Sequence, residues 1–311
     1  MHSFILFDKI KVMNYIQTSI IGAASGWGAQ KRTTEHGPDA VAYFDIIGQL
    51  SRQNYHVRWK ETIHPDQRFA NDKSPARAQC LPMVARMCEQ VYKSTLQTLH
   101  TGSRPCVIGG DHSIAIGTWS ALAAFEQGDI GLIWFDAHMD SHTPETSPSQ
   151  AIHGMSVAAL MGYGNSALTG IGQAQAKLKP ENVVLIGIRD FEDAEEKRLQ
   201  QLGVKIFYMK DIHQAGFESA LLQAINIVTA RTNSFGLSID LDGFDPEEAP
   251  GVGSPAPGGL TADQVLPYLH HLRTHPKFKA FEIMEYNPHL DINNKTIKLI
   301  HNILKNLLDR E

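Results

Sequence analysis

Short, nearly uninterrupted apolar segments alternate with longer amphipathic stretches along most of this chain. The short segments are rich in Ile, Val and Phe, and we expect strands at 19–24, 105–109, 131–135, 182–187, 204–208, 235–239 and 279–284. The longer stretches have helical spacing at 81–99, 114–126, 195–202, 217–231, 261–273 and 297–308. Strands that are apolar on both faces are typical of a sheet covered by helices on both sides. The alternation therefore predicts a single three-layer α/β/α domain with a mostly parallel central sheet.

Length and composition restrict the class of protein further. The chain has 311 residues, of which 42% are hydrophobic and 20% charged, so it can bury a large core and does not resemble a disordered chain. Its formal net charge of −5 provides no basic surface for nucleic acid. No apolar run approaches the roughly 20 residues that a membrane-spanning helix needs. We therefore expect no nucleic-acid partner and no membrane partner.

The N-terminus and the cysteines set two further expectations. Residues 1–12 lack the long apolar core and cleavage site of a signal peptide, so we interpret them as an appended arm or a start-site artefact. The cysteines, Cys80, Cys88 and Cys106, are a sparse and odd-numbered set without CxxC spacing. Such a set is a poor disulfide framework and favours a reducing, cytoplasmic location.

Two of the expected strands end in runs of side chains that bind metals. One run follows the apolar segment 130–135 and the other follows 234–239. Together they contain Asp136, His138, Asp140, Asp240 and Asp242. If each run continues its strand, its alternate side chains point to the same face. Four carboxylates and an imidazole in one pocket would repel each other unless cations lay among them. The sequence therefore predicts a metalloenzyme with two metals.

A third motif, Gly109-Gly110-Asp111-His112-Ser113, lies between an expected strand and an expected helix. The paired glycines allow a sharp turn of the backbone. His112 alone would be typical of a capped or core histidine, but beside the two acidic runs we interpret it as a metal ligand. Two long polar loops, at 26–39 and 141–153, are also expected where open α/β folds place their sites.

The segments 109–113, 136–140 and 238–261 resemble the three signature motifs of the ureohydrolase superfamily, which includes arginases, agmatinases, guanidinobutyrases and formiminoglutamases. The resemblance extends from about residue 17 to the C-terminus and implies a catalytic domain over residues 13–311. It is strongest to arginases, which implies hydrolysis of L-arginine to L-ornithine and urea by a metal-bridging hydroxide. The alternative is an agmatinase, guanidinobutyrase or formiminoglutamase that acts on a related guanidino or formimino substrate.

The resemblance also implies a pair of manganese ions, two Mn²⁺ per subunit. One ion would be held by His112, Asp136, Asp140 and Asp240. The other would be held by Asp136, His138, Asp240 and Asp242, so that Asp136 and Asp240 bridge the pair. An oxygen-rich site with two imidazoles suits Mn²⁺ better than thiolate-preferring metals. The sequence leaves cobalt and nickel open as the native metals.

Three residues are expected to act on the guanidinium group. Glu285 matches the family glutamate that holds this planar cation, for which a carboxylate is the fitting partner. His153 matches the histidine that shuttles protons to the amine leaving group. Asp140 would orient the attacking hydroxide by a hydrogen bond. Ser254 lies where arginases often have a threonine near the guanidinium group.

Two positions expected to contact the amino-acid end of the substrate depart from the arginase pattern. Ser149, in the loop after the metal cluster, matches a serine that contacts the α-carboxylate, but His142 replaces the family asparagine. A histidine can donate the same hydrogen bond. Asp190 matches the family pattern, whereas Glu192 replaces an aspartate that contacts the α-amino group and is longer by one methylene.

A protein of another class, a non-catalytic binding or regulatory protein on the same fold, is the remaining interpretation. The presence of every expected metal ligand argues against it. The family usually forms trimers or hexamers, so the resemblance implies a homo-oligomer that binds a small guanidino substrate.

Overall fold

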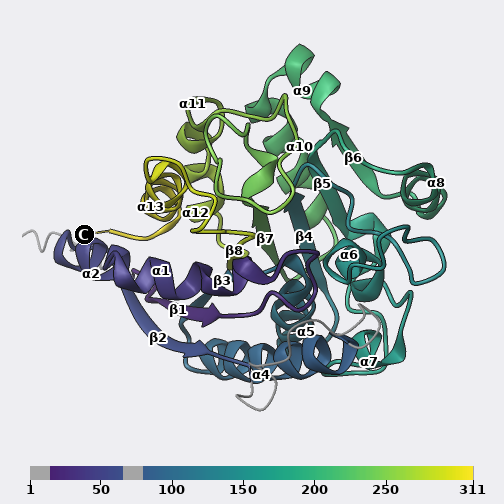
Figure 1. Cartoon of the computed structure of the whole chain (residues 1–311), viewed down its shortest axis with the longest axis horizontal. Coiled ribbons are helices and arrows are strands. Elements are labelled where there is room, and N and C mark those ends of the chain that lie inside the picture. Colours follow the sequence, from purple (N-terminus) through teal and green to yellow (C-terminus); the bar gives the residue numbers. More distant parts are fainter. Residues whose placement is uncertain (1–14, 66–79, 311) are drawn as a thin grey trace, which may run out of the picture.

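The computed structural model describes residues 15–65 and 80–310, so the predicted arm at 1–12 lies outside the described residues. In the described part, eight strands form one sheet in the order β2-β1-β3-β8-β7-β4-β5-β6 (Figure 1), and every neighbouring pair is parallel. The strands are β1 Thr18–Ala23, β2 Val57–Ile63, β3 Arg104–Gly109, β4 Ile130–Phe135, β5 Val183–Ile188, β6 Lys205–Tyr208, β7 Ser234–Asp240 and β8 Phe278–Met284. The fold is α/β with a fully parallel sheet, which confirms the predicted class.

Helices cover both faces of the sheet. One layer contains α1 Gly37–Tyr43, α2 Ile46–Arg52, α9 Met209–Ala215, α10 Phe217–Thr229, α11 Ala262–Val265, α12 His270–Arg273 and α13 Lys295–Leu307, whose apolar side chains share one core cluster. The other contains α4 Leu81–His100, α5 Ala115–Phe125, α6 Ser156–Leu160, α7 Ser166–Thr169 and α8 Asp193–Leu202. Figure 1 shows α4 and α5 below the sheet and α10 to α13 above it. No helix in the described ranges is long and apolar enough to cross a membrane.

The sequence missed one strand and misjudged two segments. The missed strand, β2, lies at the edge of the sheet, and its middle residues are polar and partly exposed, so it lacks the apolar run of the buried strands. The expected helix at 261–273 is broken into α11, a 3-10 turn at Leu266–Tyr268 and α12. The break contains Pro267, which has no amide hydrogen to donate within a helix.

The two expected loops differ in outcome. The segment 26–39 is not a loop throughout, because it contains a 3-10 helix, Arg32–His36, and the first turn of α1. Pro38 occupies the start of α1, a position where its fixed φ favours the helix. The segment 141–153 has no helix or strand until a 3-10 turn begins at His153, as predicted. It follows β4 directly and lies beside the site.

Candidate metal centre and substrate cavity

The predicted site residues follow the carboxyl ends of five adjacent strands, β3, β8, β7, β4 and β5. His112 opens the 3-10 turn His112–Ile114 after β3, and Glu285 follows β8. The first acidic run follows β4, the second begins at the last residue of β7, and Asp190 follows β5. Because parallel strands end at the same edge, residues far apart in sequence meet there.

The strand periodicity expected for the first acidic run is wrong. β4 ends at Phe135, so Asp136, His138 and Asp140 lie in the loop beyond it. Local hydrogen bonds fix this loop instead: the Asp136 amide donates to the Ile186 carbonyl at 3.0 Å, and the His138 amide donates to Asp136 Oδ1 at 2.7 Å. Asp140 has a left-handed φ of 45°. The loop therefore turns its side chains inward without the alternation of a strand.

The second run is built differently. Asp240 is the last residue of β7, and Asp242 lies in the 3-10 turn Leu241–Gly243 that follows. The Asp242 amide donates to Asp240 Oδ1 at 2.9 Å. That bond orients the other oxygen of Asp240 toward His112.

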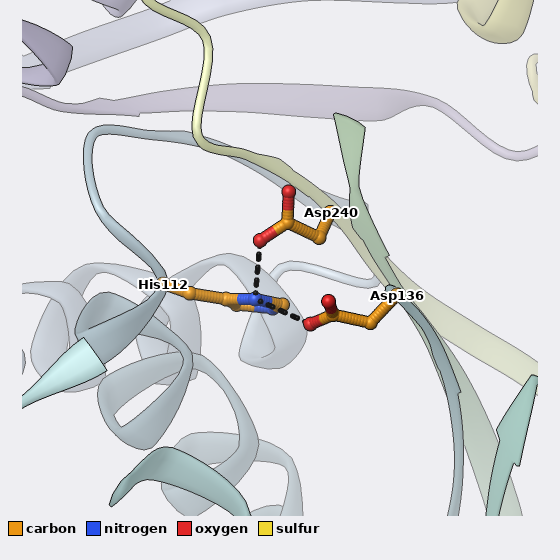
Figure 2. Close-up of side chains that lie close together, drawn as sticks. All are labelled: His112, Asp136 and Asp240. Carbon is orange, nitrogen blue, oxygen red and sulfur yellow. Dashed lines mark hydrogen bonds and ion pairs between the residues drawn. The ribbon is translucent and has the colours of Figure 1, made fainter. Parts of the chain in front are cut away.

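His112 is the centre of the first group of possible metal ligands (Figure 2). Its Nδ1 lies 2.9 Å from Asp240 Oδ2 and 3.2 Å from Asp136 Oδ2, and Figure 2 shows both carboxylates pointing at the ring. Asp140 Oδ2 is 3.3 Å from the same nitrogen. All four side chains are buried. Three carboxylates thus converge on one imidazole nitrogen, as ligands of a shared cation would.

His138 is the centre of the second group. Its Nδ1 lies 3.2 Å from Asp242 Oδ2 and 3.4 Å from Asp136 Oδ1. Asp136 therefore directs one oxygen to each histidine and joins the two groups. Asp240, predicted as a second bridge, belongs to the first group only.

Burial and neighbouring carboxylates raise the pKa values of some of these acids, whereas the histidines lower that of Asp136. Burial raises the pKa of Asp240 well above its usual range, and the carboxylates of Asp242 and Asp136 raise it further. Burial and the Asp136 carboxylate do the same to the pKa of Asp140. Burial also opposes charge on Asp136, but hydrogen bonds with His112 and His138 outweigh it and lower its pKa. Bound cations would offset this effect, because a nearby positive charge stabilises the ionised form of a buried acid.

A second layer of side chains holds His112 in place. The ring stacks on Trp134 with centroids 4.0 Å apart, and its Nε2 lies 2.8 Å from Ser238 Oγ. Ser238 in turn donates to Glu282 Oε1 at 2.6 Å, and that oxygen also accepts the indole N–H of Trp119 at 2.6 Å. With Nε2 donating to Ser238, Nδ1 is left as the lone-pair nitrogen that a metal needs. No sequence pattern predicted this relay.

The predicted catalytic residues Glu285 and His153 contact each other. His153 Nδ1 lies 2.8 Å from Glu285 Oε1, which also accepts the backbone amide of His112 at 2.8 Å. Burial opposes charge on His153, but the Glu285 carboxylate outweighs it and raises the pKa of His153 to about 9. The paired charge of His153 lowers the pKa of Glu285 against the effect of burial.

Most of the predicted residues line one cavity of about 260 Å³. Its wall contains His138, Asp140, His142, Ser149, His153, Asp190, Glu192, Asp240, Asp242 and Ser254. Three predicted residues, His112, Asp136 and Glu285, are buried but are not part of this wall. Asp190 is largely exposed, and its Oδ2 lies 3.7 Å from His138 Nε2.

Three lining residues were not predicted: Gln30, Glu195 and Gly154, the neighbour of His153. Gln30 comes from the polar segment 26–39. That segment was expected to lie at a site, but none of its residues was predicted to take part. Glu195 is buried and closes a capping box with Glu192 at the start of α8. The Glu-x-x-Glu spacing at 192–195, before a helical pattern, was the available signal for the capping box.

The donor set fits divalent cations of the Mn²⁺ class. It consists of carboxylate oxygens and imidazole nitrogens, without a thiolate. The described cysteines, Cys80, Cys88 and Cys106, are buried, form no disulfide and belong to none of the ligand groups. A metal-binding centre is thus the chemistry that the geometry and the pKa shifts support.

Comparisons with known proteins agree with this geometry. A model of the arginase family matches residues 16–309. The arginase of Bacillus caldovelox is 39% identical over 280 residues, which are 89% of this chain and 93% of the relative. A crystal structure of a Bacillus caldovelox arginase superposes with a TM-score of 0.87 at 36% identity, covering 95% of this chain and 99% of that one. An Entamoeba histolytica arginase solved in complex with L-ornithine gives 0.83 at 28% identity, with 94% and 98% covered.

The family match spans nearly the whole described chain, and the Bacillus caldovelox relative is 39% identical over 89% of this chain. The fold and the metal-binding residue types agree with it. This chain belongs to the arginase family.

Proposed function

We propose that this protein is an arginase that hydrolyses L-arginine to L-ornithine and urea. The observation that carries the proposal is the junction of two metal-ligand groups at Asp136, next to the paired side chains of Glu285 and His153. The similarity to bacterial arginases supports the substrate, as does the L-ornithine complex of the Entamoeba histolytica relative. Ornithine is the product that arginine would leave in the cavity.

The proposed cofactor is a pair of Mn²⁺ ions. His112, Asp136, Asp140 and Asp240 would hold one ion, and Asp136, His138, Asp240 and Asp242 would hold the other. The contacts of His112 and His138 support Asp136 as a bridge. The bridging role of Asp240 requires its Oδ1, which faces the Asp242 amide at 2.9 Å, to turn toward the second ion.

When bound, the two cations supply a nucleophile at neutral pH by lowering the pKa of a shared water. Asp140 would accept a hydrogen bond from that water and hold it toward the guanidinium carbon. Glu285 would hold the planar guanidinium cation, and its buried, charged state supports this role. His153 would deliver a proton to the departing amine, since its raised pKa keeps it protonated at neutral pH.

The amino-acid end of arginine would lie along the wall formed by Ser149, His142, Asp190 and Glu192, with Ser254 nearer the guanidinium group. All five residues line the same cavity as the metal groups. Ser149 would donate to the α-carboxylate, and the acidic side chains would face the α-amino group. This arrangement supports a substrate that carries both groups.

The test is urea release by purified protein loaded with Mn²⁺, measured with L-arginine, agmatine and 4-guanidinobutyrate. The proposal expects arginine to give the highest kcat/KM. Higher kcat/KM for agmatine, which has no carboxylate, would assign the chain another substrate within the family. Metal analysis of the same protein should give two Mn²⁺ per subunit, and parallel loading with Co²⁺ and Ni²⁺ would test the choice of metal.

We further propose that residues 13–311 form the catalytic domain, that the protein is a cytoplasmic homo-oligomer, and that it is a trimer or hexamer. The absence of a disulfide among the three described cysteines supports the location, and the family membership supports the domain and the assembly. Light scattering of the purified protein measures the subunit number directly.

A further inference from the structure

The two residues that depart from the arginase pattern contact each other. His142 Nε2 lies 2.9 Å from Glu192 Oε2, although the residues are 50 positions apart. His142 belongs to the loop after β4, and Glu192 is the N-cap of α8. Glu195 Oε2 lies 3.3 Å from the same nitrogen. A histidine in place of an asparagine and a glutamate in place of an aspartate therefore form one unit.

Both ring nitrogens of His142 have a protein partner. Nε2 faces Glu192, and Nδ1 lies 3.1 Å from Thr146 Oγ1. The side chain is only 7% exposed. Thr146 is itself fixed, because its hydroxyl oxygen accepts the Thr143 amide at 3.0 Å. The direct hydrogen bond from His142 to a substrate carboxylate, expected from the sequence, would require these contacts to break.

Glu192 takes part in the capping box with its backbone and with its side chain, which accepts the Glu195 amide. Its amide donates to Glu195 Oε2 at 3.3 Å in a capping box, and its side chain is 56% exposed where it lines the cavity. Asp190 and Glu195 line the same wall, and the described lining of this cavity contains no Lys or Arg. A wall of this charge suits an ammonium group better than a carboxylate.

We propose that His142 is a positioning residue that holds the Glu192 carboxylate toward the α-amino group of the substrate. The proposal rests on the proposed arginase function and assigns His142 to the amine rather than to the carboxylate. Glutamate is longer than aspartate, and His142 compensates for this by binding one of the two carboxylate oxygens of Glu192 at the cavity wall. Without His142, the Glu192 side chain would gain rotamer freedom, and its carboxylate would no longer be held toward the α-amino group.

The test uses three ligands that share the guanidinium group. L-Arginine carries the amine and the carboxylate, agmatine keeps the amine alone, and 5-guanidinopentanoate keeps the carboxylate alone. For each we would measure KM or the inhibition constant against arginine hydrolysis, and the calorimetric dissociation constant, with the Mn²⁺-loaded enzyme. The variants are His142→Ala, Glu192→Gln and the double variant.

His142→Ala should weaken the binding of arginine and agmatine by about tenfold. The binding of 5-guanidinopentanoate should change by no more than about twofold. The kcat for arginine should change far less than KM, because the metals and Glu285 are untouched. The double variant should be no worse than Glu192→Gln alone, since residues that act as one unit are not additive. The combined change His142→Asn and Glu192→Asp, which restores the family pair, should recover arginine binding.

Three outcomes would overturn the proposal. Weaker arginine and 5-guanidinopentanoate binding with unchanged agmatine would make His142 a direct carboxylate contact. An equal loss of affinity for all three ligands would mean that His142 has only a structural role. No loss of affinity for any ligand would mean that His142 has no role in binding. Asp193→Asn is the matched control, because Asp193 is adjacent to Glu192, carries the same charge and is 91% exposed. It should leave all three ligands unchanged.

The melting temperature of each variant separates misfolding from loss of positioning. Absence of urea release from arginine by the wild-type enzyme would count against the proposed function. In that case the calorimetric constants for the three ligands still decide the role of His142, so the two failures are distinguishable.

Discussion

His153 Nδ1 lies 2.8 Å from Glu285 Oε1, and the same oxygen accepts the backbone amide of His112. One carboxylate thus connects the proposed proton donor to the segment that carries a proposed metal ligand. The three residues come from separate segments of the chain: the loop after β4, the end of β8 and the turn after β3. The proposed proton delivery and the proposed metal binding would therefore be positioned by one buried contact.

The first prediction concerns His153. The variant His153→Ala should lower kcat by about 10²-fold or more, the usual contribution of a positioned general acid, with a smaller effect on KM. Steady-state urea release measures both constants. Added imidazole should restore part of kcat if the lost function is proton transfer. An unchanged kcat would remove His153 from the reaction.

The second prediction concerns the metal count. In His138→Ala, the second ligand group loses its only imidazole, while the first group around His112 is intact. The manganese content should fall from about two ions to about one per subunit, and turnover should nearly vanish. Metal analysis after gel filtration is the measurement. His36→Ala, at a half-exposed histidine outside the cavity, is the control. Two retained ions and full turnover in His138→Ala would contradict the two-metal proposal.

The third prediction concerns the relay behind His112. Glu282→Gln keeps the size of the side chain but weakens the acceptor that orients Ser238 and, through it, His112. Outer partners of metal-bound histidines typically contribute about 10–100-fold to metal affinity, so Mn²⁺ should bind correspondingly less tightly. Competition with a chelator measures the affinity. Glu61→Gln, at a partly exposed acid of β2, should leave it unchanged. Wild-type affinity in Glu282→Gln would show that the relay does not act on the metal.

Much of the fold and site could be predicted because the signals are local. The buried strands are apolar on both faces, and metal-binding residue types follow directly after β3, β4 and β7. The parallel arrangement then brings those strand ends together. The edge strand β2 gave no such signal, because its exposed positions carry polar residues.

The remaining features depend on contacts between distant residues. The pairing of His142 with Glu192 and the relay from Ser238 to Glu282 join segments that are 50 and 44 residues apart. Each residue alone is compatible with another role, and only the folded backbone selects its partner. Aspartate adopts a left-handed φ more often than most residues, but the loop decides that Asp140 does so.

The fourth prediction concerns pH and Glu195. Burial is the main cause that raises the pKa of Glu195 from 4.5 to about 7. Between these values the folded state binds the proton that the unfolded state has released, so stability should fall as pH rises from about 4.5 through about 7. The loss is about 1.4 kcal/mol per unit of pKa shift, or about 3 kcal/mol in total.

The variant Glu195→Gln should remove this fall. Glutamine does not ionise, but its one carbonyl oxygen can accept only one of the two amides, of Ser141 and of Glu192, that Glu195 now binds, so the comparison uses the pH slope and not the absolute stability. Thermal unfolding of both proteins between pH 4.5 and 7.5, in the same metal-loaded state, gives the comparison. The same pH slope in the variant and the wild type would assign the titration to another group.

The fifth prediction concerns Gly110, in the turn that carries His112. A side-chain carbon at this position would overlap the backbone carbonyl of Ser25, and a backbone atom cannot move aside as a flexible side chain can. The neighbouring amide of Asp111 donates to that same carbonyl at 2.8 Å, so the close approach is also a hydrogen-bonded one. Overpacking of this kind costs about 1–3 kcal/mol or more. Gly110→Ala should therefore lower the melting temperature and, by displacing His112, weaken Mn²⁺ binding as well.

Gly154→Ala is the matched control for this change. Gly154 lines the same cavity beside His153, but a side-chain carbon there would have no atom within 4 Å. Its effect on stability should stay within about 0.5 kcal/mol, as for most substitutions into open space. Calorimetric melting of both variants, with and without Mn²⁺, separates the two glycines. Equal melting temperatures would mean that the Gly110 turn can widen. The close approach of Ser25, just after β1, to this turn would then not be what holds His112 in place.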